Sequence, residues 1–232
     1  MSHSVRRHLR LEIDAYDETI RRFIPGYEAM VAVAADSVAA IEPDLVCDLG
    51  AGTGALAEAL LERAGVGIVE LLDVDAEMLS RARQRLARFG DRARYSLRSY
   101  DGPFSRCDAF AASISLHHIP TIEAKSGLYA RAFASLRPGG VLVNADPYMP
   151  FDSCERDRLF RYWADHLVAS GIAEARAWKH FEEWAEEDTY FPLDVELDVL
   201  TSIGFEVECA WTDGPMVVVV ATKRHDQAAS GS

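Results

Sequence analysis

The sequence predicts an α/β fold: a mostly parallel sheet covered by helices on both faces and closed by an antiparallel hairpin. Two observations support this prediction. Between residues 45 and 146, short apolar runs alternate with amphipathic stretches long enough for helices, which is typical of βαβ units and a parallel sheet. Near the end, strand patterns at 205–212 and 216–221 are joined by a turn so short that the two strands must run antiparallel.

The elements before the hairpin follow from hydrophobic spacing. Apolar residues at helical intervals predict N-terminal helices within residues 4–42, interrupted at Pro25-Gly26. The predicted strands are Leu45–Leu49, Ile68–Val74, Ala93–Leu97, Ala109–Ser115 and Val141–Asp146. The predicted helices between them are Ala55–Ala64, Ala76–Arg88 and Ile122–Leu136.

The closing hairpin combines an edge strand with an inner strand. Alternating apolar and polar residues from Phe205 to Thr212 indicate a strand with one face in water, whereas the continuous apolar run Met216–Ala221 indicates a strand covered on both faces. We expect residues 1–224 to form a single domain and the polar tail, 225–232, to be disordered.

An aromatic insertion separates the fifth strand from this hairpin. Nine of the 41 residues from Phe151 to Phe191 are aromatic, many of them at helical spacing. We expect residues 151–191 to form a helical lid, with two or three of the aromatic side chains lining a substrate pocket. The acidic run Glu182–Asp188 is expected to be a solvated face.

Composition restricts the partners. The formal charge of −13 disfavours a polynucleotide substrate, because nucleic-acid-binding domains carry basic patches. No apolar run reaches the roughly 20 residues of a membrane span, and no signal peptide is expected. The four cysteines form no paired motif and are expected to be buried in a reduced, cytoplasmic protein. We expect a small-molecule substrate; the oligomeric state stays open, with a homodimer as one candidate.

The most informative segment is VCDLGAGTG, residues 46–54. An apolar strand leads into glycines at positions 50, 52 and 54, and an amphipathic helix follows. Glycine permits positive φ and close approach of a ligand, and the first turn of the helix offers unpaired N–H groups. The pattern predicts a nucleotide-like ligand, which is either a dinucleotide or an adenosyl cofactor.

A carboxylate ends the second strand. Asp73 closes the apolar run, and a carboxylate at this place can accept hydrogen bonds from both hydroxyls of a ribose. Val74 and Met78 are then placed to flank adenine. The alternative is that Asp73 caps the next helix, although Asp75 is better placed for that role.

Two histidines follow the fourth strand. Because ligands bind beyond the carboxyl ends of parallel strands, His117 and His118 fall near the predicted site, where either acts as a general base or only packs against it. No metal is expected, because adjacent histidines rarely converge and no carboxylate partner is evident. Asp146 and Tyr148 follow the fifth strand and are predicted either to meet the substrate or to form loop hydrogen bonds.

Four ordered motifs resemble those of class I S-adenosylmethionine-dependent methyltransferases: DLGAGTG at 48–54, LLDVD at 71–75, SLHHI at 115–119 and LRPGGVLV at 136–143. The resemblance spans nearly the whole chain. It implies a Rossmann-like seven-stranded sheet with an antiparallel last strand, and S-adenosylmethionine as cofactor. It also implies cofactor contacts from Asp48, Gly50, Ala51, Gly52, Asp73, Val74, Ser99, Tyr100 and Ser113.

A second resemblance concerns IPGYEAM, residues 24–30, which is similar to the carboxy-S-adenosylmethionine synthase group. This similarity implies a cofactor contact from Tyr27. In that group an arginine of the insertion holds the extra carboxylate of the cofactor. Here the corresponding segment, AWKHFEEW, has Lys179 and His180 and no arginine at the matching place.

The predicted function is methyl transfer from S-adenosylmethionine to a small molecule. One alternative keeps the cofactor and changes the reaction to cyclisation or modification of S-adenosylmethionine itself. A tRNA-modification enzyme, a dehydrogenase and a regulatory protein with the same fold are further alternatives. The intact carboxylates at Asp48 and Asp73 argue against a regulatory protein with a degenerate pocket.

Overall fold

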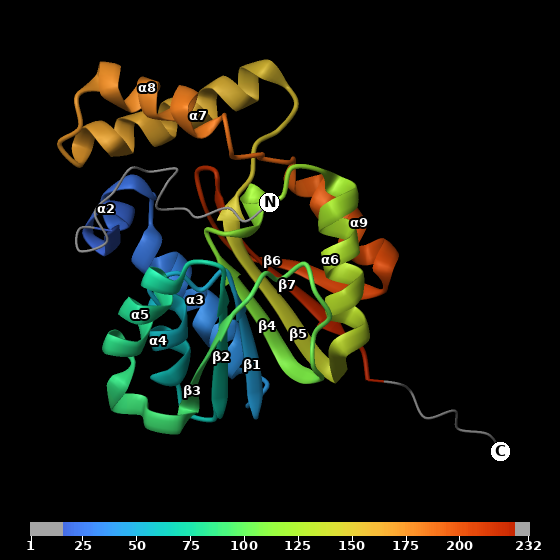
Figure 1. Ribbon diagram of the computed structural model, residues 1–232. Helices are drawn as coiled ribbons and strands as arrows, with labels where there is room; N and C mark the ends of the chain where they lie inside the picture. The colour runs from blue at the N-terminus through green and yellow to red at the C-terminus, as the bar shows by residue number, and fades with distance from the viewer. Residues whose placement is uncertain (1–15, 226–232) are drawn as a thin grey trace.

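A seven-stranded sheet in the order β3-β2-β1-β4-β5-β7-β6 runs through the computed structural model, which describes residues 16–225 (Figure 1). Strands β1 to β5 are parallel, and β7 is antiparallel to both of its neighbours, β5 and β6. This arrangement confirms the predicted fold class. The strands are β1 (Leu45–Leu49), β2 (Ile68–Asp73), β3 (Ala93–Leu97), β4 (Cys107–Ser113), β5 (Leu136–Pro147), β6 (Phe205–Asp213) and β7 (Met216–Lys223).

Helices cover the sheet in two layers, and a helical pair lies above its upper edge (Figure 1). One layer contains α3, α4 and α5, and the opposite layer contains α6 and α9. The α-helices are α2 (Tyr16–Phe23), α3 (Tyr27–Ala39), α4 (Ala55–Leu61), α5 (Ala76–Arg85), α6 (Ile122–Ser135), α7 (Ser153–Ala169), α8 (Glu174–Trp184) and α9 (Leu193–Ile203). The described residues also contain two short 3₁₀ helices, η2 (Ala87–Arg92) and η3 (Leu116–His118).

Each helix layer buries its own apolar face against the sheet. The α3–α4–α5 layer packs on residues such as Val46 and Leu71, and the α6–α9 layer packs on residues such as Leu49 and Phe110. The inner strand β7 is buried from Met216 to Ala221, as its continuous apolar run predicts. These two cores hold the carboxyl ends of β1, β2 and β4 together at one edge of the sheet.

Several predicted boundaries shift. Helix α4 ends at Leu61, and α5 ends at Arg85 before a kink at Gly90, where φ is 56°. Strand β5 begins at Leu136 rather than Val141, because its first residues pair with Cys107 across an irregular register. The predicted helix before residue 16 and the predicted tail after residue 225 lie outside the described residues, and the limits of the domain stay predictions.

Two of the four cysteines are buried and two are exposed, which corrects the expectation that all four are interior. Cys47 and Cys107 are buried, whereas Cys154 and Cys209 are exposed. Cys154 lies in the first turn of α7, and Cys209 lies on the edge strand β6 beside a register shift. Across residues 16–225, no helix has both the length and the apolar character that a membrane span requires.

Candidate active site

The glycine loop between β1 and α4 is a tight turn with its backbone in the left-handed region. Gly50 has φ 69° and Gly52 has φ 53°, which favour glycine at both positions. The N–H groups of Gly50 and Ala51 donate to the carbonyl of Leu72 at 2.9 and 3.0 Å. These bonds fasten the loop to the end of β2 and bring it beside Asp73.

Asp73, at the end of β2, holds the loop from the other side. Its Oδ2 accepts from the N–H of Gly52 at 2.8 Å, and its Oδ1 accepts from the N–H of Asp75 at 2.8 Å. Burial raises the pKa of Asp73, against the effect of these two hydrogen bonds. Each oxygen keeps a second lone pair for a ligand hydroxyl. Asp75 caps α5 by accepting from the N–H groups of Glu77 and Met78, as predicted.

Asp48, on β1, is a deeply buried carboxyl group at this edge of the sheet, with an exposed fraction of 1%. Burial, and then the nearby charge of Asp73, raise the pKa of Asp48 to about 8. Its Oδ2 has no hydrogen-bond partner among residues 16–225. An acid held in this way binds a nearby cation favourably, because the cation stabilises the ionised form.

These groups surround an outer cavity of about 290 Å³. All eleven residues that the sequence predicts as cofactor contacts line it, although contact with a cofactor stays a prediction for each. They are Tyr27, Asp48, Gly50, Ala51, Gly52, Asp73, Val74, Met78, Ser99, Tyr100 and Ser113. The cavity also has wall residues that sequence reasoning did not single out, among them Tyr16, Ile20 and Arg98.

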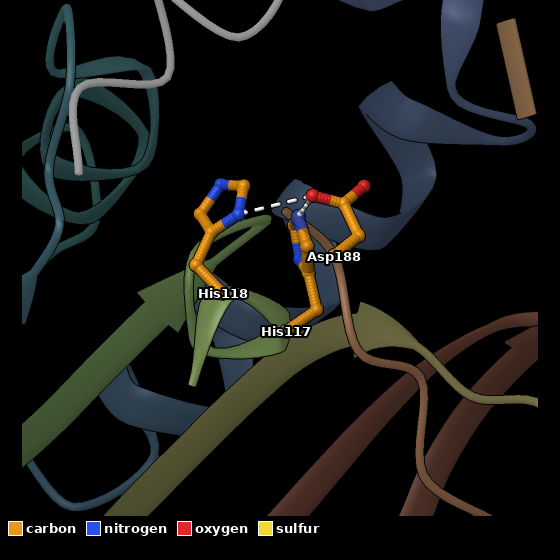
Figure 2. A group of neighbouring side chains, drawn as sticks. All are labelled: His117, His118 and Asp188. Carbon is orange, nitrogen blue, oxygen red and sulfur yellow. Dashed lines mark ion pairs between the residues drawn. The ribbon is translucent and has the colours of Figure 1, made fainter. Parts of the chain in front are cut away.

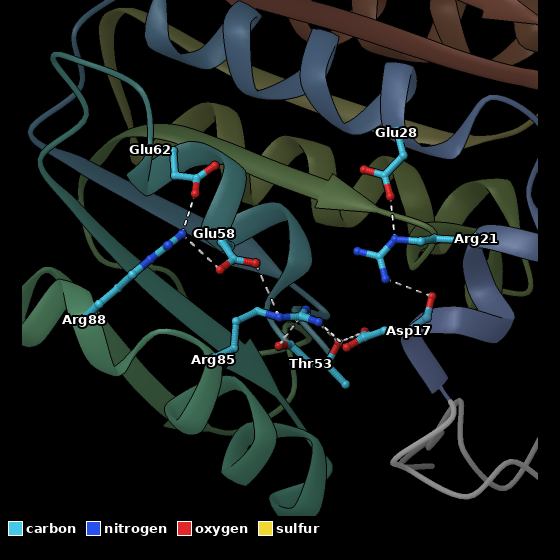
Figure 3. A network of polar contacts seen from close by, with 8 residues as sticks. All are labelled: Asp17, Arg21, Glu28, Thr53, Glu58, Glu62, Arg85 and Arg88. Atoms are coloured by element: carbon cyan, nitrogen blue, oxygen red, sulfur yellow. Dashed lines mark hydrogen bonds and ion pairs between the residues drawn. The ribbon is translucent and has the colours of Figure 1, made fainter.

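A polar network holds α2 over the glycine loop (Figure 3). The hydroxyl of Thr53, in the loop, donates to Asp17 of α2 at 2.6 Å. Arg85 of α5 pairs with Asp17 and donates to the carbonyl of Thr53 at 3.1 Å. Arg21 continues the network from α2 to Glu28 of α3. The network fixes Tyr16 and its helix as one wall of the outer cavity.

The carboxyl end of β4 carries local strain. Ile114 has φ 50°, which is an outlier for a β-branched side chain and costs of the order of 1–3 kcal/mol. Its N–H still donates to the carbonyl of Ala145 at 2.9 Å, so the distortion is held by the sheet. The turn directs the chain into η3, which carries His117 and His118. Such strain is concentrated at functional sites.

A small inner cavity of about 30 Å³ lies between η3, α2 and the lid. His118 and Ile114 line both this cavity and the outer one, so the two are adjacent. The lid contributes Trp163 and Trp184, and Trp163 donates its indole N–H to the carbonyl of Phe23 at 2.6 Å. The aromatic insertion therefore forms both core and cavity wall.

His117 and His118 both contact Asp188 beside the inner cavity (Figure 2). Nδ1 of His117 lies 2.7 Å from Oδ1 of Asp146, and Nδ1 of His118 lies 3.1 Å from Oδ1 of Asp188. Burial lowers the pKa of His117, but Asp146 and Asp188 outweigh it and raise the pKa overall. Burial and the neighbouring His117 lower the pKa of His118. The hydroxyl of Tyr190 donates to Oδ2 of Asp188 at 2.7 Å.

The structure brings His117, His118 and Asp146 together, but it excludes Tyr148 from both cavities. Tyr148 is buried on the sheet face covered by α6 and α9. Its hydroxyl donates to Glu196 at 2.9 Å. This position fits the hydrogen-bonding alternative for Tyr148, and a catalytic role for Tyr148 stays a prediction.

Asp188 lines the inner cavity and was missed by sequence reasoning. It belongs to the acidic run predicted to be solvated, yet its side chain is only 6% exposed. Burial raises the pKa of Asp188, but the two histidines outweigh it and lower the pKa to about 2. No local signal marked this residue, since the lid brings it to the histidines from 70 positions away in sequence, which is the separation of Asp188 and His118.

The same three side chains meet the distance requirement of a metal centre. Ligand atoms of His117, His118 and Asp188 lie within 4.8 Å of one another, so the expectation that no carboxylate accompanies the histidines is wrong. We assign no metal to them. Asp146 already holds His117, and Asp188 already contacts His118 and Tyr190, which accounts for the position of each group without an ion.

Comparisons with known proteins agree with this geometry. Residues 46–140 match the methyltransferase-domain family. An uncharacterized methyltransferase of Geobacillus kaustophilus is 27% identical over 215 residues, which cover 91% of this chain and 90% of that protein. A carboxy-S-adenosyl-L-methionine synthase of Aeromonas salmonicida is 27% identical over 171 residues, which cover 70% of this chain and 68% of that protein.

A solved structure shows the same fold. Human N-acetylserotonin methyltransferase in complex with S-adenosylmethionine superposes with a TM-score of 0.58 over 96% of this chain, at 18% identity. The chain spans 63% of the length of that enzyme. At this level of identity the likeness is one of fold alone.

Proposed function

We propose that this chain, which belongs to the S-adenosylmethionine-dependent methyltransferases, transfers a methyl group to a small molecule held beneath its helical lid. The observation that carries the proposal is the contact between the two cavities. Because His118 and Ile114 line both, a nucleophile in the inner cavity lies next to a donor in the outer one. The charge of −13 and the lid over the site support a small acceptor rather than a polynucleotide.

The outer cavity fits S-adenosylmethionine. Asp73 offers free lone pairs for ribose hydroxyls beside Val74 and the buried Met78, which suit adenine. At the other end, Asp48 offers an oxygen that has no hydrogen-bond partner among the described residues to the positively charged methionine half. Gly52 leaves open space, since a Cβ built there meets no atom within 4 Å. The donor set therefore matches the chemistry of this cofactor.

The residues of the chain align the two reactants, exclude water and provide a proton acceptor. When bound, S-adenosylmethionine supplies a methyl group already activated by the sulfonium. Correct alignment of two reactants contributes up to roughly 7–11 kcal/mol to lowering a barrier, and the glycine loop and lid provide it. His118 is poised to accept a proton at Nε2, because Asp188 lies against Nδ1 and its negative charge stabilises the imidazolium. His117 and Asp146 form a second buried histidine–carboxylate contact, which lies beside this pair and helps to position it.

Chemistry of the inner cavity favours methyl transfer over formation of a carboxylated cofactor. A second carboxylate on the cofactor requires a cationic partner, and none of the described residues that line the inner cavity is a lysine or an arginine. Asp188 would also repel it. The similarity to carboxy-S-adenosyl-L-methionine synthases therefore supports a shared cofactor site more than a shared product.

Product analysis tests the proposal. The protein is incubated with S-adenosylmethionine and a panel of small amines, phenols and carboxylic acids, and the products are identified by mass spectrometry. S-adenosylhomocysteine together with a methylated acceptor supports methyl transfer. Methylthioadenosine would instead indicate cyclisation or elimination, and a carboxylated cofactor would indicate the synthase reaction. A reaction without protein gives the background.

A further inference from the structure

We propose that Asp17 of α2 is a positioning residue for the acceptor cavity. It ties α2 to the glycine loop, and in this way it couples cofactor binding to closure of the lid. The coupling rests on the proposed methyl transfer, in which the inner cavity receives the acceptor. Two observations carry it: the place of α2 between the two cavities, and the different contacts on the two sides of this helix.

Helix α2 belongs to the walls of both cavities. Its first residue, Tyr16, lines the outer cavity, and its last residue, Phe23, lines the inner cavity. Ile20 lies between them on the same face of the helix and lines both cavities. A displacement of α2 therefore changes the shape of the donor cavity and of the acceptor cavity together.

On one side, α2 packs against the lid. The indole N–H of Trp163 donates to the carbonyl of Phe23 at 2.6 Å, and the ring of Phe23 lies 5.4 Å from the ring of Trp184. All three side chains are buried. Arg22 also donates to the carbonyl of Ser170 at 3.0 Å. Separating these groups would expose aromatic surface to water, so we expect α2 and the lid to move as one unit.

On the other side, α2 is held to the glycine loop by polar contacts of Asp17 (Figure 3). Oδ1 of Asp17 accepts from the hydroxyl of Thr53 at 2.6 Å, and Oδ2 pairs with Arg85 of α5. The side chain of Asp17 is 32% exposed, so water can take the place of its partners when the helix moves away. Ion pairs that are open to water cost little to separate. This contact is therefore the point where α2 can leave the loop.

The inner cavity requires such a movement. Its volume is about 30 Å³, and a single water needs roughly 10–15 Å³ of that measure, so an acceptor enters only when the lid and α2 withdraw. The chain has a break that permits the movement. Pro25-Gly26 separates α2 from α3, and Gly26 has φ 60°, in the left-handed region.

Occupation of the outer cavity then favours closure of the inner one. Thr53 of the loop and Tyr16 of α2 both line the outer cavity, so a cofactor bound there lies between the loop and the helix and favours their contact. By reciprocity, a closed lid raises the affinity for the cofactor by the same factor. Asp17 is not among the described residues that line either cavity, so it acts through α2 and not on a ligand.

Acrylamide quenching of tryptophan fluorescence tests the coupling without any acceptor. Three of the four tryptophans, Trp163, Trp178 and Trp184, belong to the lid, so the emission reports chiefly on its closure. The quenching constant is measured with and without saturating S-adenosylhomocysteine. Asp17→Ala is compared with the native protein and with Glu18→Ala, a control that removes an exposed carboxylate from the same turn of α2.

We expect S-adenosylhomocysteine to lower the quenching constant at least twofold in the native protein and in Glu18→Ala, and to leave it unchanged in Asp17→Ala. A second variant approaches the same contact from α5. Arg85→Met removes the cationic partner of Asp17 at a position that is not among the described residues lining either cavity. We expect this variant to lose at least half of the response. If circular dichroism shows that Asp17→Ala does not fold, the result for Arg85→Met decides.

Three results would overturn the coupling. The first is a native protein that binds S-adenosylhomocysteine in calorimetry without a change in quenching. The second is a full response in Asp17→Ala or in Arg85→Met, and the third is loss of the response in Glu18→Ala. None of these results touches the proposed function, because the measurement needs no turnover. That function fails separately if the product assay yields no methylated acceptor.

Discussion

The backbone N–H of Gly52 donates to the carboxylate of Asp73 at 2.8 Å, so the two parts of the cofactor site that the sequence places 21 positions apart are joined directly. The bond gives Asp73 two tasks: it holds the glycine loop in shape, and it offers its other lone pairs to a ribose. The first prediction follows from this double role.

Asp73→Ala lowers the affinity for S-adenosylmethionine at least tenfold, or about 1.4 kcal/mol, because both the loop anchor and the hydroxyl acceptor are lost. Calorimetric titration with the cofactor measures the change. Asp36→Asn, which alters an exposed carboxylate on α3, is the control and keeps the native affinity. Equal affinities in all three proteins would exclude Asp73 from the cofactor site.

Gly50→Ala and Gly52→Ala separate folding from binding. A Cβ at Gly50 meets Cβ of Ser115 at 2.7 Å, so Gly50→Ala loses stability as well as binding. A Cβ at Gly52 meets nothing within 4 Å and lies beside the outer cavity. Gly52→Ala therefore costs only the roughly 1–2 kcal/mol of its left-handed backbone but reduces cofactor affinity at least tenfold. Urea unfolding and calorimetry distinguish the two variants.

Asp48 links cofactor binding to pH. Its pKa of about 8 means that the carboxyl group is protonated near neutrality, and a bound sulfonium or ammonium group favours ionisation. We expect cofactor binding to release a proton below pH 8 and affinity to rise from pH 6.5 to pH 8.5, within the range set by that pKa. Calorimetry in two buffers of different ionisation enthalpy detects the release, and Asp48→Asn abolishes it. The same heat in both buffers would contradict the link.

The same shift affects stability. The pKa of Asp48 is raised in the folded state relative to its ordinary value of 3.8, so its contribution to stability is complete below that value and is lost as pH rises through about 8. Between pH 6 and pH 9 the native protein therefore loses more stability than Asp48→Asn does. Urea midpoints across this range provide the measurement, and parallel curves for the two proteins would be inconsistent with the raised pKa.

Glu196 is the centre of a buried polar cluster on the opposite face of the sheet. It pairs with Lys125 at 2.7 Å and accepts from Tyr148 at 2.9 Å and from Asn144 at 3.1 Å. Glu196→Ala leaves a buried ammonium group unpaired, which costs about 3–5 kcal/mol of unfolding free energy. Asp198→Ala, an exposed change on the same helix, stays within about 0.5 kcal/mol in urea unfolding. Similar losses in both variants would contradict the cluster's role.

Thiol titration checks the burial pattern. The exposed Cys154 and Cys209 react with an aromatic disulfide reagent in the native protein. Cys47 and Cys107 react only after denaturation, because burial excludes the reagent and raises the pKa of Cys107 to about 12. The expected count is two thiols in buffer and four in guanidinium, since the two exposed and two buried residues add to four. Four fast thiols in buffer would contradict the fold.

The sequence predicts the outer cavity far better than the inner one, because the features of the outer cavity depend on residues that are close together in the sequence. The glycine loop, Asp73 and the helix cap at Asp75 depend on residues a few positions apart, whose backbone preferences are readable from their types. The five strands and the hairpin follow from hydrophobic period for the same reason. Their order in the sheet then brings the predicted cofactor residues to one edge without further information.

The inner cavity depends on tertiary contacts that no local pattern encodes. Asp188 is acidic like the solvated residues before it in the run. Only the docking of the lid on α2 buries it beside His118. Tyr148 shows the opposite case. It follows the end of β5, where a ligand is expected, but Glu196 of α9 holds its hydroxyl on the other face of the sheet. In both cases a partner distant in sequence decides the outcome.

The position of β7 affects how this protein is made. The strand comes last in the chain, yet it lies between β5 and β6 and pairs with both. A nascent chain emerging from the ribosome therefore displays an open β5 border until residue 223 has left the exit tunnel. During that interval β5 offers unpaired backbone groups to other chains, which makes the unfinished polypeptide prone to aggregation until β7 arrives.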